Sequence, residues 1–340
     1  MLFHVRDRKL RALARESFAE DCKRIQNGQT AKRALETDIY ITNVCNLRCN
    51  YCYFYFEDYF NAPSHHTPGD PTLSQLKSLV DKISGKTYCL VMLGGEPFSR
   101  RDLVEFLAYT RTKDIFSIRI STNGLLLKRK KDALPYIDTL SVSFDAMRVR
   151  QYPRQENRLL KDLSDLKAEF GDALPKIIPS WTTSPDDDFE KDVRPLLDFA
   201  VAHEFVVKFL PLKVNQHADW EKQRSIILQA IEYAGPQYVT NQLGHTVQLE
   251  TQYGGRNCLV QGNQFYIDYE GQFLYPCDEY AHQKVGSVYE HDLDELYEEG
   301  VRRFGNYPRN DGICAHCPSG CHSDNSYILR FPERQLQWLA

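Results

Sequence analysis

The stretch TDIYITNVCNLRCNYC, residues 37–52, joins a run of strand-forming residues to three closely spaced cysteines. Its first half is rich in β-branched and aromatic residues, which is typical of a strand. Cys45, Cys49 and Cys52 follow, with three and then two residues between them. In a reduced protein, cysteines grouped in this way indicate metal ligation. The sequence therefore predicts a strand over residues 37–45 that ends at a metal-binding loop.

The identity of the metal stays open at this point between an iron–sulfur cluster, a zinc ion and chance spacing. A structural zinc usually has four ligands, which come as two separated pairs. A 4Fe–4S cluster held by only three cysteines keeps one iron open to another ligand. Three thiols without a fourth therefore favour the cluster.

A strand followed by a helical pattern recurs along the first two thirds of the chain. The predicted strands cover residues 37–45, 88–97, 116–124, 138–146, 176–184 and 205–213. Helix-compatible stretches lie between them, at residues 71–84, 101–113, 156–170 and 188–203. Near-continuous apolar strands that alternate with helices indicate a parallel sheet with right-handed crossovers. Six such units are two short of a closed eightfold barrel, so we predict an α/β fold with a partial (β/α)6 TIM-like barrel.

Active sites of such sheets lie at the carboxyl ends of the strands. The predicted strand ends bring together a set of small, polar and thiol side chains, namely Cys45, Gly94, Gly95, Glu96, Asn123, Asp145 and Thr182.

The pattern changes after about residue 235. Residues 258–280 alternate apolar and polar positions around Glu270 and Gly271, which predicts a β-hairpin with a cysteine near each end. A short amphipathic helix is predicted over residues 292–305. We therefore expect three parts: an N-terminal helical extension over residues 1–35, the barrel over 36–235, and a small cysteine-rich hairpin and helix module with a tail over 236–340.

Composition excludes several classes of protein. The net charge of −4 gives no support for a nucleic-acid partner with a broad basic face. The apolar runs are far shorter than the ~20 residues that a membrane span needs, so no membrane partner is expected. The N-terminus has charges in its first turns and no apolar signal region, which indicates the reducing cytoplasm. Cys22 and Cys89 are expected to be inert buried thiols.

The cysteine motif CNLRCNYC resembles the CxxxCxxC signature of the radical S-adenosylmethionine (SAM) enzymes, and GGEP at residues 94–97 resembles their second motif. STNG (121–124) and SVSFDA (141–146) are similar to the third and fourth strand endings of that family. The resemblance covers roughly residues 36–215. It implies a 4Fe–4S cluster that reduces SAM to a 5′-deoxyadenosyl radical, which abstracts a substrate hydrogen. It also implies an external one-electron reductant, such as a flavodoxin or ferredoxin-like protein.

The resemblance also implies roles for individual residues. The methionine part of SAM would chelate the open iron, and Gly94 and Gly95 would let the backbone approach this ligand. Glu96 would accept a charge-assisted hydrogen bond from the ligand ammonium.

Tyr51 would lie near the adenine, and a plain packing role for it stays open. Ser143 and Asp145 are alternate positions of one strand, so both face one side and could bind ribose hydroxyls. Asp145 could equally cap a helix. Asn123 fits a turn before Gly124 and could equally touch SAM. Thr182 and Leu210 would be contacts from the fifth and sixth strands.

The C-terminal module resembles the SPASM/Twitch auxiliary-cluster domains of this family. It has five cysteines, fewer than the longer SPASM form with two clusters, so we expect one auxiliary 4Fe–4S cluster. The expected ligands are Cys258, Cys277, Cys314 and Cys317. The leftover Cys321 would replace one of them, act as a redox or hydrogen-donating thiol, or be structural. A zinc ion is the alternative for this module.

SPASM/Twitch enzymes commonly modify ribosomally made peptides, whereas others act on sugars, aminocyclitols or nucleosides in natural-product biosynthesis. The roughly 35 residues before the first strand are too few for a winged peptide-recognition domain, although a separate chain could supply one. We favour a peptide substrate slightly over a small molecule. A non-catalytic iron–sulfur or zinc scaffold is the alternative of another class, and the presence of both motifs disfavours it.

Overall fold

The computed structural model describes residues 3–27, 29–52, 69–212, 220–239, 259, 261–278, 283–307, 329 and 332–340. Within these residues, nine strands form one sheet in the order β6-β5-β4-β3-β2-β1-β7-β8-β9. The strands are β1 (Ala34–Tyr40), β2 (Thr87–Leu93), β3 (Ser117–Thr122), β4 (Thr139–Ser143), β5 (Lys176–Thr183), β6 (Lys208–Pro211), β7 (Gln264–Ile267), β8 (Gln272–Leu274) and β9 (Lys284–Ser287).

Strands β1 to β6 are all parallel to their neighbours, and they follow one another across the sheet in chain order. This confirms the predicted α/β fold with a parallel sheet of six β/α units. The strands themselves are shorter than predicted at their carboxyl ends. The difference arises because the residues after each strand turn into the loops that carry the motifs.

The helices that the structure describes are α1 (Arg8–Gln26), α3 (Leu73–Ile83), α4 (Leu103–Thr110), α5 (Ala146–Gln151), α6 (Pro153–Phe170), α7 (Arg194–Ala202), α8 (Trp220–Ala234), α10 (Leu293–Phe304) and α13 (Pro332–Trp338). Short 3₁₀ segments are η2 (Pro97–Ser99), η3 (Leu127–Tyr136), η4 (Gly171–Ala173) and η6 (Pro236–Tyr238), and one π-helical turn is η5 (Phe189–Val193). Local sequence explains several helix starts. The Thr72 side chain and Gln75, for example, form a capping box at the start of α3.

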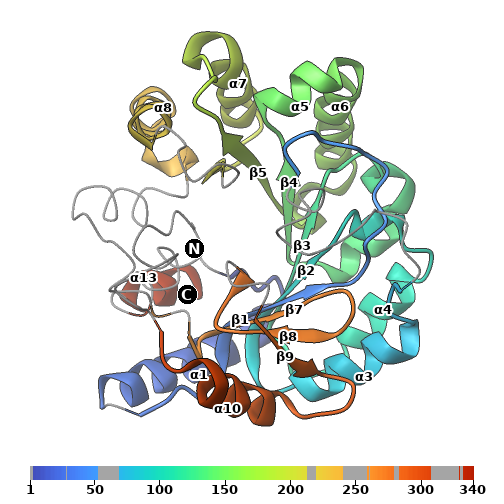
Figure 1. Ribbon diagram of the computed structural model, residues 1–340. Coiled ribbons are helices and arrows are strands. Elements are labelled where there is room, and N and C mark those ends of the chain that lie inside the picture. The colour runs from blue at the N-terminus through green and yellow to red at the C-terminus, as the bar shows by residue number, and fades with distance from the viewer. Residues whose placement is uncertain are drawn as a thin grey trace.

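The helices α3, α4, α6 and α7 cover the convex face of the curved sheet, and its concave face opens to the opposite side (Figure 1). Apolar side chains from these helices and alternate strand residues form one continuous core. On β1 the core residue is Ile39, on β2 they are Leu90 and Met92, and on β3 they are Ile118 and Ile120. The intervening strand residues therefore face the concave side.

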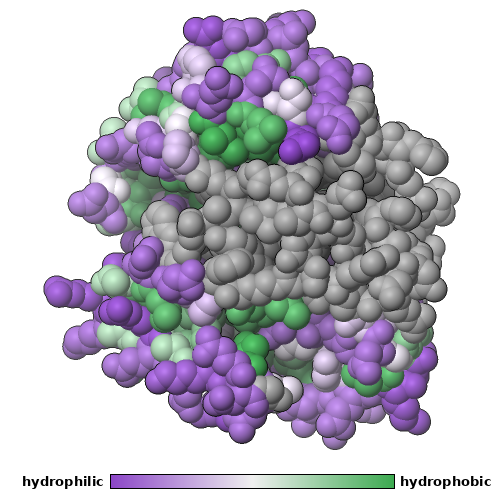
Figure 2. Space-filling model, turned by 90° about the vertical axis from the view of Figure 1, so that its left-hand side faces the viewer, coloured by the Kyte–Doolittle hydropathy of each residue, from purple (hydrophilic) through white to green (hydrophobic). Residues whose placement is uncertain are grey.

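The concave side of β1 and β3 is polar at several positions. Glu36 and Asp38 of β1 are buried there, and Arg119 of β3 lies beside them. In the view of Figure 2, the outer margin of the described surface is mostly hydrophilic, and hydrophobic patches lie further in. Buried polar groups are costly unless they form hydrogen bonds or ion pairs, so the partners of these residues on the concave face matter for the functional site.

The predicted hairpin is confirmed, because β7 and β8 pair antiparallel. An additional strand, β9, pairs antiparallel with β8. The sequence did not indicate that β7 would also pair in parallel with β1 and so continue the main sheet. Without this pairing β1 would be an edge strand with unsatisfied backbone groups.

The N-terminal helix α1 packs against the sheet beside the C-terminal helix α13 (Figure 1). Phe3, Phe18 and Tyr88 form stacked and edge-on ring contacts in this second apolar cluster. The predicted N-terminal helix is therefore an integral part of the packing. In the part of the chain that the structure describes, no helix has both the length and the apolar character needed to span a membrane.

Candidate functional site

Residues 41–52, which we call the cysteine loop, leave the carboxyl end of β1 beside the Gly94–Glu96 turn. The Gly95 amide donates to the Thr42 carbonyl at 2.8 Å, and the Glu96 amide donates to the Val44 carbonyl at 2.7 Å. These bonds continue the parallel pairing of β1 and β2 beyond both strands. The first two sequence motifs are therefore held together by their own backbones.

This close backbone approach explains why glycine stands at positions 94 and 95. A Cβ at Gly94 would lie 2.3 Å from the Thr42 carbonyl oxygen, and Gly94 also has a positive φ of 146°. A Cβ at Gly95 would lie 2.4 Å from the Val44 carbonyl oxygen. The sequence interpretation placed a ligand against these glycines. The structure shows a more immediate requirement, which is room for the cysteine loop.

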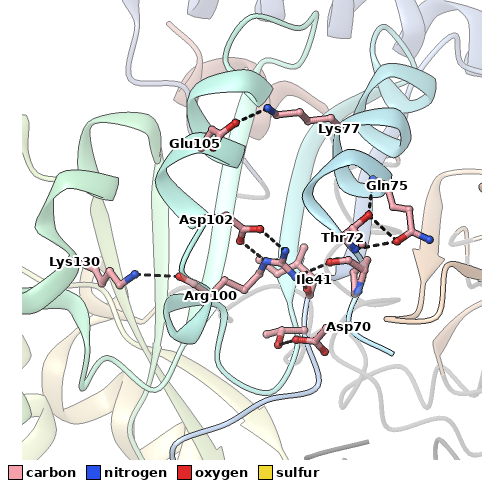
Figure 3. A network of polar contacts seen from close by, with 11 residues as sticks. Ile41, Asp70, Thr72, Gln75, Lys77, Arg100, Asp102, Glu105 and Lys130 are labelled. Atoms are coloured by element: carbon pink, nitrogen blue, oxygen red, sulfur yellow. Dashed lines mark hydrogen bonds and ion pairs between the residues drawn. The ribbon is translucent and has the colours of Figure 1, made fainter. Parts of the chain in front are cut away.

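Two charged residues hold the start of the cysteine loop (Figure 3). Asp70 accepts hydrogen bonds from the Thr42 hydroxyl and, at 2.7 Å, from the Asn43 amide. Arg100 donates to the Ile41 carbonyl at 2.7 Å while it forms a two-bond ion pair with Asp102. A planar guanidinium suits such a fixed fork of acceptors. Sequence analysis missed Asp70 and Arg100, because neither lies in a recognisable motif.

The three thiols of the cysteine loop are partly exposed and form no disulfide with any cysteine that the structure describes. The Cys45 sulfur accepts from the Leu47 amide at 3.4 Å, and the Cys52 amide donates to the Cys49 carbonyl at 3.2 Å. Burial raises the pKa of Cys45, and it raises the pKa of Cys49 to about 11. Burial therefore favours the neutral form of these two thiols.

No group of three or more His, Cys, Asp or Glu side chains is close enough to hold a metal ion within the described residues. The ligand roles of Cys45, Cys49 and Cys52 thus stay predictions. The chemistry of the donor set nevertheless fits a cluster, because three partly exposed thiols share one backbone-anchored loop and form no disulfide within the described part of the chain.

Glu96 is fully buried, and its carboxylate links the turn after β2 to the carboxyl end of β3. Its Oε1 accepts from the Phe98 amide at 2.9 Å and the Thr122 hydroxyl at 2.7 Å. Its Oε2 accepts from the Asn123 amide at 2.7 Å. Burial raises the pKa of Glu96, and these hydrogen bonds oppose the rise. Glu96 therefore organises the strand ends, and its predicted bond to the ligand ammonium stays a prediction.

Asn123 lies directly against the cysteine loop. Its side-chain amide donates to the Asn46 side-chain oxygen at 2.7 Å and approaches the Cys45 sulfur at 3.9 Å. Its own oxygen accepts from the Leu125 amide at 3.1 Å. Asn123 thus stabilises the turn at Gly124 and also contacts the cysteine loop.

Asp145 and Tyr51 meet at the end of β4. The Tyr51 hydroxyl donates to Asp145 Oδ2 at 2.8 Å, and Asp145 Oδ1 caps α5 by accepting from the Arg148 amide at 2.9 Å. Burial raises the pKa of Asp145 to about 6, while these bonds oppose the rise. Both the helix-cap role and proximity to Tyr51 are thus present, and the ribose and adenine contacts stay predictions.

Helix α5 also docks on the cysteine loop. The Arg48 amide donates to the Tyr152 hydroxyl at 3.0 Å, and the Asn50 amide donates to Gln151 Oε1 at 3.1 Å. Arg148, which is buried, donates to the Ser143 and Asn123 carbonyls, each at 2.6 Å. These contacts join the cysteine loop to β3 and β4 from one helix. No residue pattern indicated them in advance.

The remaining strand-end candidates are placed further along the sheet. Ser143 of β4 pairs in register with Ser180 of β5, and Thr182 of β5 pairs with Leu210 of β6. Ser143, Thr182 and Leu210 are all partly exposed. Their ligand roles stay predictions.

Of the five C-terminal cysteines, the structure describes only Cys277, which follows β8, is partly exposed and forms no disulfide with another described cysteine. Cys258, Cys314, Cys317 and Cys321 lie outside the described residues. The auxiliary-cluster ligand set therefore stays a prediction.

A cavity of about 770 Å³ lies far from all these groups. Its lining includes Arg6 of the N-terminal segment, and Asp138 and Lys176 at the amino ends of β4 and β5. Since the cysteine loop lies at the carboxyl ends, this cavity is not the site described above.

Comparison with known proteins agrees with the geometry. Residues 39–163 match the radical SAM superfamily, and residues 258–318 match the SPASM iron–sulfur cluster-binding domain. Both matches fall inside the predicted barrel and C-terminal units, whose boundaries stay predictions. A radical SAM domain implies a 4Fe–4S cluster with SAM, and a SPASM domain implies auxiliary iron–sulfur clusters.

Among curated proteins, the chain is similar to an S-adenosylmethionine-dependent nucleotide dehydratase from Selenomonas ruminantium, with 33% identity over 120 residues. It is also similar to a GTP 3′,8-cyclase from Actinobacillus pleuropneumoniae, with 31% identity over 137 residues. These matches cover 34% and 38% of this chain, and 40% and 39% of the relatives. The chain thus spans about two fifths of the length of these relatives.

Among solved structures, Streptococcus suis SuiB bound to the precursor peptide SuiA matches with a TM-score of 0.60 and 16% identity, over 88% of this chain and 72% of that one. The structure of anSMEcpe with bound AdoMet matches with a TM-score of 0.55 and 14% identity, over 89% of this chain and 98% of that one. At such identities the matches show the fold alone. Together, the two family matches show that the chain contains a radical SAM domain over residues 39–163 and a SPASM domain over residues 258–318.

Proposed function

We propose that this chain reductively cleaves SAM and uses the resulting 5′-deoxyadenosyl radical to abstract a hydrogen atom from a peptide substrate. The observation that carries the proposal is the backbone pairing of the cysteine loop with Gly95 and Glu96, at 2.8 and 2.7 Å. It holds three thiols, a glycine turn and a buried carboxylate at one end of the sheet. A cluster bound there would supply the electron that breaks the SAM carbon–sulfur bond.

In this proposal Cys45, Cys49 and Cys52 hold the 4Fe–4S cluster. Asp70 and Arg100 fix the path of the cysteine loop through its first carbonyl and amide groups. Other residues proposed to surround SAM are Tyr51, Gly94, Gly95, Glu96, Asn123, Ser143, Asp145, Thr182 and Leu210.

One auxiliary 4Fe–4S cluster is proposed on Cys258, Cys277, Cys314 and Cys317, with Cys321 as a spare thiol. An external flavodoxin or ferredoxin-like protein would supply the electron. Reduced, unpaired thiols such as buried Cys22 and Cys89 favour a reducing compartment, so we place the enzyme in the cytoplasm.

A peptide substrate is supported by the SPASM match and by the similarity of 88% of the chain to a structure that contains a precursor peptide. A second candidate is the same radical chemistry on a nucleotide, nucleoside or sugar. It is favoured by the nucleotide-related curated relatives, which match at 31–33% identity.

The test of SAM cleavage uses the anaerobically reconstituted full chain with SAM and dithionite. We expect methionine and 5′-deoxyadenosine in equal amounts, and no product above background would refute the proposal. Cys49→Ala should abolish the products and lower the iron content by about four atoms per chain. Cys22→Ala, which removes a buried thiol on α1, is the matched control and should leave both unchanged.

A separate measurement distinguishes the substrate classes. Short peptides and nucleotides are each added to the enzyme, and the production of 5′-deoxyadenosine is compared with its rate without addition. Stimulation by nucleotides and not by peptides would favour the second candidate.

A further inference from the structure

The middle of the cysteine loop, around Cys49, is held by the side chain of Gln151 at the end of α5. The Gln151 side-chain nitrogen donates to the Arg48 carbonyl at 2.7 Å, and its oxygen accepts from the Asn50 amide at 3.1 Å. Arg48 and Asn50 are the two chain neighbours of Cys49. One side chain therefore fixes the backbone on both sides of this cysteine.

The chemistry of a side-chain amide suits this position. A backbone carbonyl needs a donor and a backbone amide needs an acceptor, and a glutamine offers both groups in one plane. The Gln151 nitrogen also donates to the Tyr152 hydroxyl at 3.2 Å, and this hydroxyl accepts from the Arg48 amide at 3.0 Å. Three backbone groups of residues 48–50 are thus bound by two adjacent side chains.

Helix α5 is itself fixed to the strand ends, so it can serve as a rigid support for this contact. The Asp145 carboxylate caps its first turn by accepting from the Arg148 amide at 2.9 Å. Arg148, of which 1% is exposed, donates to the Ser143 and Asn123 carbonyls, each at 2.6 Å. Through α5, the position of Cys49 therefore follows the ends of β3 and β4.

The other two cysteines of the loop have different supports. The carbonyl directly before Cys45 accepts from the Glu96 amide at 2.7 Å. The Cys52 amide donates to the Cys49 carbonyl at 3.2 Å, so a shift of Cys49 would also move Cys52. The relative positions of the three thiols therefore depend on two separate anchors, which are the glycine turn for Cys45 and Gln151 for Cys49.

The exposure of Gln151 separates this role from a role in the stability of the whole fold. Gln151 lies on the surface of the molecule, at the last position of α5. Substitutions at surface positions away from the core and the helix caps usually change the free energy of unfolding very little. Replacing Gln151 should therefore affect what the cysteine loop binds more than whether the chain folds.

We propose that Gln151 is a positioning residue for the 4Fe–4S cluster, and that it acts by fixing the backbone on both sides of Cys49. The inference rests on the proposed function, because it takes Cys49 as a cluster ligand. Replacing a residue that orients a metal ligand without touching the metal typically lowers metal affinity ten- to hundredfold. Hydrogen bonding and solvent exposure around the sulfurs also set the reduction potential of an iron–sulfur cluster.

The first test compares two variants of the metal-free full chain. Gln151→Met keeps the length and the helix propensity of the side chain and removes both its donor and its acceptor. Gln229→Met is the matched control, because Gln229 is an exposed glutamine on α8 whose side-chain nitrogen donates to the Ser225 carbonyl at 3.2 Å. Hydrogen exchange of the Asn50 amide should be about tenfold faster in Gln151→Met, since the bond to Gln151 is lost, and unchanged in Gln229→Met. Urea unfolding should show similar stability for the two variants.

Iron retention and the reduction potential are measured on the anaerobically reconstituted chain. Gln151→Met should lose iron to the chelator bathophenanthroline disulfonate about ten- to hundredfold faster than the unaltered chain. The potential of the SAM-binding cluster is followed by electron paramagnetic resonance, and this cluster is identified by its response to added SAM. The potential should shift upward, because greater access of water favours the more negative, reduced cluster. Tyr152→Phe, which removes a single hydroxyl, should change both quantities in the same direction by a smaller amount.

An unchanged Asn50 exchange rate, rate of iron loss or potential in Gln151→Met would overturn the inference, as would equal effects of Gln151→Met and Gln229→Met. If Gln151→Met fails to fold, Tyr152→Phe decides the inference by the same measurements. The iron content of the unaltered chain separates these results from a failure of the proposed function. If the unaltered chain binds its SAM-binding cluster and Gln151→Met behaves in the same way, only the inference falls. If the unaltered chain binds no such cluster, the proposed function and the inference fall together.

Discussion

Replacing Gly94 by alanine tests whether the glycine turn positions the cysteine loop. The added Cβ would lie 2.3 Å from the Thr42 carbonyl oxygen and 3.1 Å from the Thr42 nitrogen. Both are backbone atoms, and the Thr42 carbonyl accepts the Gly95 amide at 2.8 Å. The loop must therefore move away from the turn, and this hydrogen bond is weakened or lost.

Gly69→Ala is a matched control for the backbone conformation. Gly69 has a φ of 147°, almost the same as the 146° of Gly94, and a Cβ there would meet no described atom within 4 Å. Both substitutions thus incur the same backbone strain, of about 1–3 kcal/mol. Only Gly94→Ala adds the clash, at about 1–3 kcal/mol, and a lost hydrogen bond, at about 0.5–1.5 kcal/mol. We expect Gly94→Ala to be less stable than Gly69→Ala by about 2–4 kcal/mol.

Anaerobic urea unfolding followed by circular dichroism compares the free energy of unfolding of the two variants. Iron content after reconstitution is the second readout, and it should fall in Gly94→Ala and stay near the wild-type level in Gly69→Ala. Equal losses of stability in the two variants, with equal iron contents, would refute the reasoning, because the contact with Thr42 would then have no energetic effect.

Three further predictions concern other parts of the site. Because the pKa of Asp145, about 6, lies above its ordinary value of about 3.9, the folded chain binds a proton between pH 4 and 6 that the unfolded chain does not. Stability should therefore fall as the pH rises through this window, by up to about 3 kcal/mol. In Asp145→Asn this part of the pH dependence should vanish in urea unfolding at pH 4 and 7, and an unchanged slope would contradict it. Arg100→Lys should lower the free energy of unfolding by about 2–3 kcal/mol and speed hydrogen exchange in the cysteine loop, because one ammonium cannot replace the guanidinium bonds to two carbonyls and to Asp102. The exposed neighbour Arg101→Lys is its control, and similar effects from both would argue against the anchor. Cys277→Ala should lower the iron content from about eight to about four atoms per chain, and a full complement of iron would show that Cys277 is not a ligand.

The parallel sheet could be predicted from the sequence because each strand is a short apolar run bounded by polar residues and followed by a helical period. The hairpin over residues 264–274 was predicted for the same reason, since its alternation has a period of two around Glu270 and Gly271. Such signals depend only on residues close together in the chain, so they can be recognised without knowledge of the fold.

The pairing of β7 with β1 could not be predicted in this way. It joins Glu36 to Gln264, residues that are 228 positions apart in the chain. An edge strand accepts any suitable partner, so the sequence of neither strand identifies the other. The contacts of Gln264 with Glu36 and Asp38 depend on this pairing and were therefore also missed.

The amino-acid sequence by itself determined the identity of the cysteine and glycine motifs, because the chemistry of three thiols and the backbone freedom of glycine belong to residue types and short spacings. Only the tertiary structure decided which side chains hold these motifs in place. Asp70 and Arg100 reach the cysteine loop from more than 25 positions away, and their side chains act on backbone carbonyls and amides, which every residue has. The same holds for Asp38, which accepts a hydrogen bond from Gln264, 226 positions away in the chain.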